Sequence, residues 1–108
     1  MSLPRQDIFV SLFNGITAPG FSIVWLPISP MKSFVVDGLG SGKIRIMVSN
    51  DQRAGGDTPA SARWTALPTE IEEDGPFEHV SSFTAYQLDC YDLTGNGPLF
   101  VDAASRRL

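Results

Sequence analysis

Eight prolines and ten glycines are spread along this chain of 108 residues, and they leave little room for an uninterrupted helix. Between them lie short apolar runs, a pattern that is typical of a β-protein. The runs predict strands at 8–13, 21–26, 33–36, 43–49, 62–67, 83–90 and 99–101. We therefore expect an all-β fold, a two-sheet antiparallel β-sandwich of jelly-roll or immunoglobulin-like type, with about seven short strands and little or no helix.

The run at 43–49 shows the clearest alternation in the chain. Ile44, Ile46 and Val48 fall on one side of an extended backbone, whereas Lys43 and Arg45 fall on the other. A period of two predicts a strand with one face in the core and one face in water. In contrast, the run at 21–26 is apolar on both faces, so we expect one face to meet the core and the other to be covered by something else, for which a neighbouring subunit is one candidate.

Length and composition predict one domain that spans residues 1–108. Its hydrophobic fraction of 43% and charged fraction of 19% are ordinary for a globular protein. The net charge is −4 and the basic residues are scattered, so no basic patch indicates a nucleic-acid partner. No apolar run is long enough to span a bilayer, and the start of the chain does not resemble a signal peptide. We expect synthesis in the cytoplasm and no membrane partner.

The residues that could carry chemistry are few. Cys90 is the single cysteine, and its place in an apolar run predicts a small buried group. A nucleophile would need a base, and His79 is the single histidine. The glycines at 38–42 precede Lys43, but the spacing of a phosphate loop is not met, so a hairpin turn is the expected role. We predict no catalytic, cofactor-binding or metal-binding residue, and no enzyme.

Two stretches that are poor in bulky apolar side chains are predicted to be loose. The first is residues 1–7, a possible N-terminal arm, and the second is a long flexible loop at 52–61. Each could contact a partner or be a disordered surface segment. Together with the run at 21–26 they supply the predicted partner contacts, which are Leu3, Pro4, Arg5, Phe21, Ile23, Trp25, Arg53, Asp57 and Pro59.

The segment from Val36 to Leu67 resembles a pattern in small β-sandwich accessory proteins of tailed-phage virions. The pattern is a Gly-rich turn (Gly38, Gly42), an alternating strand ending in Ser49-Asn50-Asp51, and a further strand with Trp64-Thr65-Ala66-Leu67. We expect Trp64 to lie on the inner face beside Ile44. The chain departs from the pattern at Gln52, where Gly is expected, and by the long insertion that follows.

The resemblance implies a non-catalytic virion protein without cofactors. The first expectation is a capsid decoration or cement protein that binds the major capsid protein, forms a dimer or trimer, and resides in the virion. An alternative is a neck, tail or fibre adaptor. A carbohydrate-binding module is a third possibility, and it requires Trp25 or Trp64 to be exposed.

Overall fold

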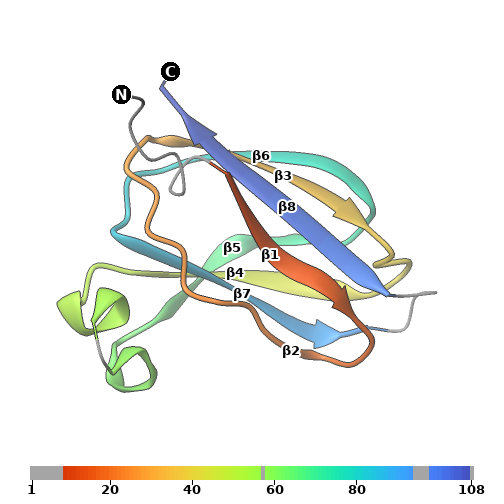
Figure 1. Cartoon of the computed structure of the whole chain (residues 1–108), viewed down its shortest axis with the longest axis horizontal. Coiled ribbons are helices and arrows are strands. Elements are labelled where there is room, and N and C mark those ends of the chain that lie inside the picture. The colour runs from red at the N-terminus through yellow and green to blue at the C-terminus, as the bar shows by residue number, and fades with distance from the viewer. Residues whose placement is uncertain (1–8, 57, 94–97, 108) are drawn as a thin grey trace, which may run out of the picture.

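The computed structural model describes residues 9–56, 58–93 and 98–107, and within them the chain forms eight strands and two short 3-10 helices (Figure 1). The strands are β1 (Phe9–Ile16), β2 (Gly20–Phe21), β3 (Met31–Asp37), β4 (Lys43–Ser49), β5 (Thr65–Ile71), β6 (Gly75–Val80), β7 (Ala85–Asp92) and β8 (Leu99–Arg106). The helices, η1 (Gln52–Gly55) and η2 (Pro59–Ser61), both lie between β4 and β5. The prediction of an all-β fold is confirmed.

The strands form two four-stranded antiparallel sheets that pack as a β-sandwich. The first sheet has the order β1-β8-β3-β6 and the second has the order β2-β7-β4-β5. Strand 1 pairs with 8, 2 with 7, 3 with 6 and 4 with 5, as in one long hairpin rolled up on itself. Pairing of β3 with β8 and of β4 with β7 completes the sheets. This connectivity is that of a jelly roll.

The core lies between the sheets and follows the alternation in the sequence. Ile44, Ile46 and Val48 of β4 point inward as predicted. A cluster of aromatic rings fills one end, where Trp25 packs against Phe34 and Tyr86 with ring centroids 6.1 and 6.2 Å apart. Cys90 is a free thiol buried in the same core, which confirms its predicted role as a small apolar group.

The predicted six-residue strand at 21–26 is wrong. Regular pairing with β7 stops after Phe21 and returns at a single bridge between Trp25 and Tyr86. Between these points the Ser22 hydroxyl accepts the Leu88 N–H at 2.9 Å, so a side chain replaces the backbone carbonyl in the ladder. The chain then crosses from the second sheet to the first, along residues 22–30, which we call the crossover (Figure 1).

Three further expectations need correction. Strand β6 was not predicted, because Gly75 and Pro76 read as the end of an acidic turn. The glycines at 38–42 do not form a hairpin, since β3 and β4 belong to opposite sheets. The 52–61 loop is not without regular structure, because η1 and η2 lie within it. The strand at 43–49 has the predicted bounds.

All four edge strands carry features that hinder pairing with another chain. Pro68 lies within β5 and Pro76 within β6, and proline has no N–H to donate. Strand β1 has two register shifts against β8, and β2 is two residues long. Short, bulged or proline-containing edges protect a sheet from strand addition. Side chains, rather than exposed backbone, are therefore the natural contacts of this molecule.

Candidate functional site

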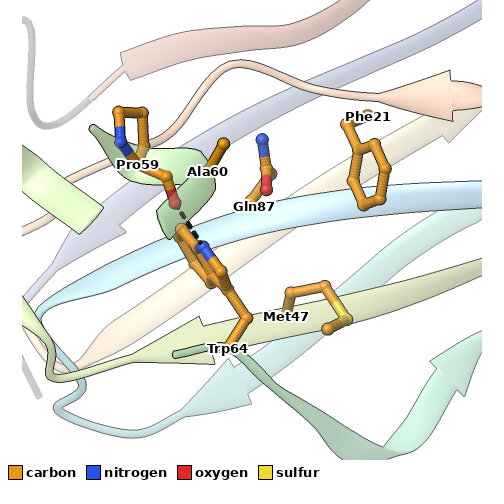
Figure 2. A pocket seen from close by; sticks show the side chains of 6 residues that line it. All are labelled: Phe21, Met47, Pro59, Ala60, Trp64 and Gln87. Atoms are coloured by element: carbon orange, nitrogen blue, oxygen red, sulfur yellow. Dashed lines mark hydrogen bonds between the residues drawn. The ribbon is translucent and has the colours of Figure 1, made fainter. Parts of the chain in front are cut away.

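A surface groove of about 400 Å³ lies on the outer face of the second sheet (Figure 2). Its walls come from β2, β4, β7, η2 and the residue just before β5. Most of the lining is apolar, and the residues are Phe21, Met47, Pro59, Ala60, Trp64 and Gln87. We call this hollow the groove.

Strand alternation places these side chains outside the core. Met47 of β4 lies opposite Gln87 of β7 in the ladder, and both are half-buried. Their neighbours Ile46 and Leu88 point to the other side and are fully buried. The floor of the groove is therefore the solvent side of two central strands, which predicts a rigid surface.

Trp64 forms one wall, and it is held in place by the loop that precedes it. Its indole N–H donates to the Pro59 carbonyl at 3.0 Å, as the dashed line in Figure 2 shows. The expectation that Trp64 lies on the inner face beside Ile44 is wrong, since it lines the groove beside Met47. The β5 ladder begins only after Trp64, so alternation within the strand does not fix its side.

Asp51 organises the loop that carries the other wall. Its carboxylate accepts the Arg53 backbone N–H and caps η1, and it also accepts the Arg63 backbone N–H at 3.1 Å. The Arg53 guanidinium binds the same carboxylate at 2.7 Å, which holds the pKa of Asp51 well below its usual range. One side chain thus ties together the start and the end of the 52–63 segment.

The rest of the outer face of the second sheet is charged. Arg45 on β4 contacts Asp89 at 3.4 Å and Glu70 at 3.9 Å, and its guanidinium stacks on the Tyr91 ring at 3.9 Å. The Tyr91 hydroxyl bonds Glu70, and this bond raises the pKa of Tyr91. The outer face therefore has an apolar half at the groove and a charged half around Arg45.

A second apolar surface lies on the crossover. Ile23, Leu26 and Ile28 expose 60%, 42% and 84% of their surface, respectively. Leu26 borders Gly55 of η1, so the crossover continues to the loop between β4 and β5. Three exposed apolar side chains that follow closely along one segment are a candidate contact surface.

The predicted contact residues fall into five groups. Phe21 and Pro59 line the groove, Ile23 is exposed on the crossover, and Arg53 is exposed beside Asp51. Trp25 is only 3% exposed, so its expected role as a partner contact is wrong. Its backbone bridge to Tyr86 turns the indole inward. Leu3, Pro4, Arg5 and Asp57 lie outside the described residues.

The sequence did not single out Met47, Gln87, Ala60, Leu26 or Ile28. Met47 follows Lys43 and Arg45 on the wet side of the alternating strand, and this signal could have indicated an apolar outer patch. Ile28 lies in a Pro-bounded loop, where no periodicity indicates exposure.

The groups that could act as nucleophile and base lie on different sheets. Cys90 is on β7 and fully buried, and burial raises the pKa of its thiol. His79 is on β6, where burial and the nearby Lys32 lower its pKa. Within residues 9–56, 58–93 and 98–107, no three His, Cys, Asp or Glu side chains are grouped to hold a metal ion.

Comparisons with known proteins do not indicate a function for this chain, so a functional interpretation depends on the fold and the two surfaces. No family model, curated protein or solved structure matches this chain. None of the helices in the described residues has the length and apolar character needed to cross a membrane.

Proposed function

We propose that this chain is a non-catalytic structural protein of a virus particle, which binds the major capsid protein or another virion protein through its crossover. The single observation that supports this proposal is the apolar surface of Ile23, Leu26 and Ile28. Burying a fully exposed Leu or Ile side chain is worth about 1.5–3 kcal/mol, and covering the exposed part of a half-buried one is worth proportionally less. A partner that covers all three gains several kcal/mol from this segment alone, before the cost of association.

The fold supports the same class of function by analogy. Jelly rolls recur in viral capsid proteins and in lectins, although a fold alone does not define a function. A lectin-like role is less well supported by the groove, because the Trp64 N–H and the Gln87 amide nitrogen already donate to backbone carbonyls. A sugar needs free polar groups to orient it beside an aromatic ring.

The function within the particle is that of a decoration protein. A protein that binds only the assembled shell stabilises it by mass action, since dissociating the shell also requires releasing the bound protein. A neck, tail or fibre adaptor is the alternative, and the number of copies distinguishes the two. Many copies spread over the shell support decoration, whereas a single ring at one vertex supports an adaptor.

The test uses particles purified from a strain in which the gene is deleted, to which purified protein is added back. We expect the wild-type protein to cosediment with the particles and Ile28→Asp to bind at least about tenfold more weakly, because a charge cannot enter an apolar contact without cost. Val80→Asp is the matched control, since Val80 is a half-exposed apolar residue on β6, in the other sheet. Equal binding of Ile28→Asp and wild type, or no binding of either, would contradict the proposal.

A further inference from the structure

The groove lies between two ends of the molecule that carry opposite charge. At the η1 and η2 end, the side chains of Arg53 and Arg63 expose 49% and 88% of their surface. Asp51, which contacts both, exposes only 8% of its side chain, so the guanidinium groups form the outer surface there. This end is basic.

The turn from β5 to β6 lies at the opposite end of the molecule (Figure 1), and its exposed residues are acidic. Glu72 and Glu73 are exposed in or beside this turn, and Glu70 and Asp89 face outward just before it. Lys43 offsets part of this negative charge by its ion pair with Glu72. Arg45 offsets more of it by its ion pairs with Glu70 and Asp89. Along the strands, the outer face of the second sheet therefore runs from basic through apolar to acidic.

We propose that this face binds the same face of a second copy of the chain. The two-fold axis runs across the strands at the level of Met47, so that the basic end of each copy covers the acidic end of the other. Both apolar grooves then meet at the centre of the contact. The proposal concerns a surface separate from the crossover, and it does not depend on the virion assignment.

Charge complementarity indicates that the occupant is a second copy. A two-fold axis brings the same patch of both subunits together, so the patch must be complementary to itself. A face with one basic end, one acidic end and an apolar centre meets that condition when it is turned end to end. The whole chain has a net charge of −4, and pairing the opposite ends offsets the resulting repulsion between two copies.

The edge strands support packing of faces over pairing of strands. Pro68 in β5 and Pro76 in β6 hinder the formation of a continuous sheet across two copies at these two edges. Phe21 and Trp64 border the groove, and aromatic side chains are enriched at the centres of protein interfaces.

The first experiment measures self-association by sedimentation velocity over a range of concentrations up to about 100 µM, where contacts of micromolar affinity are populated. We expect the wild-type chain to form a dimer. Ala60→Arg should be a monomer over this range, because the new side chain fills the groove from the exposed surface of η2. Ile28→Asp is the matched control and should form a dimer like the wild type, and thermal unfolding checks that each variant is folded.

The second experiment tests the orientation by exchanging charges. Arg63→Glu and Glu73→Lys should each weaken the homodimer, because each places like charges together at both ends. An equimolar mixture should form a heterodimer in preference to either homodimer, since both contacts then pair opposite charges. Native mass spectrometry resolves the three species.

Two results would overturn the inference. One is a wild-type chain that remains a monomer at the highest concentration, and the other is an Ala60→Arg variant that dimerises as well as the wild type. A Trp64 emission shift on adding glycans to a monomeric wild-type chain would assign the groove to a carbohydrate instead. The two proposals can fail separately. Ile28→Asp tests particle binding without touching the groove, whereas Ala60→Arg tests dimer formation without touching the crossover.

Discussion

The two sides of the second sheet differ although the same strands supply both. On the inner side, Ile44, Ile46 and Leu88 are completely buried against the other sheet. On the outer side, Met47 and Gln87 are only half covered and line the groove. Because successive side chains of a strand point to opposite faces, a residue in the core is followed by one at the surface.

The difference shows that the two sides have separate roles. The inner side is filled by aliphatic and aromatic groups, and their burial stabilises the sandwich. The outer side has an apolar half and a charged half, and neither is needed to close the core. Substitutions on the inner side should therefore change the free energy of unfolding, whereas those on the outer side should change association.

The largest effect is expected for adjacent residues on β7. Leu88→Ala removes a fully buried side chain and should lower the free energy of unfolding by about 2–5 kcal/mol. Gln87→Ala, one residue away on the outer side, loses a hydrogen bond to the Ser22 carbonyl and should cost about 1 kcal/mol. Urea unfolding followed by fluorescence measures both. Equal losses would break the distinction between the two sides.

A smaller effect is expected where the chain passes from one sheet to the other. Gly38 has a φ of 93°, and an added Cβ would lie 2.1 Å from the Pro98 carbonyl oxygen. Gly38→Ala should therefore lower the free energy of unfolding by about 1–3 kcal/mol. Gly20→Ala is the control, because nothing lies within 4 Å of its Cβ position. If both variants unfold at the same urea concentration, the close approach at Gly38 does not limit stability.

The smallest effect concerns an inward-facing polar residue on the first sheet. His79 has a buried Nε2 without a hydrogen-bond partner in the described residues, and it lies opposite Lys32 in the ladder. Burial, and then the charge of Lys32, lower its pKa below 6.5, so the unfolded chain takes up a proton first. Stability should be complete above pH 6.5 and fall as the pH drops below it.

His79→Leu measures this contribution. The variant should show a flatter dependence of unfolding free energy on pH between 7 and 5, so that its stability relative to the wild type rises as the pH falls. An unchanged pH dependence would show that another group titrates. Measurements above pH 8, where His79 is neutral in both states, serve as the reference.

Much of the fold could be predicted from the residues alone. Alternation in 43–49 gave a strand with the observed bounds, because Ile and Val on one side and Lys and Arg on the other leave one way to bury the chain. The prediction of a strand at 21–26 was wrong, because a run that is apolar on both faces does not show where the backbone stops pairing with the neighbouring strand. That point depends on the Ser22 hydroxyl, which accepts the N–H of Leu88, a residue 66 positions away in the sequence.

The candidate site could be predicted only in part. Phe21, Ile23, Arg53 and Pro59 were named because they lie in apolar or loose segments, and each is at the surface. Trp25 was predicted to be a partner contact but is buried, because its backbone bridge to Tyr86 decides which face of the sheet its side chain occupies. The groove itself depends on Met47, Trp64 and Gln87, which three separate segments bring together.

The prolines within β5 and β6 also affect the protein at high concentration. A chain crowded many times onto one surface risks growing into open-ended fibres, because each free strand can recruit another. Here Pro68 and Pro76 interrupt the row of backbone N–H groups that an added strand would need as hydrogen-bond donors. Crowding should therefore not extend the sheets by adding strands at the β5 or β6 edge.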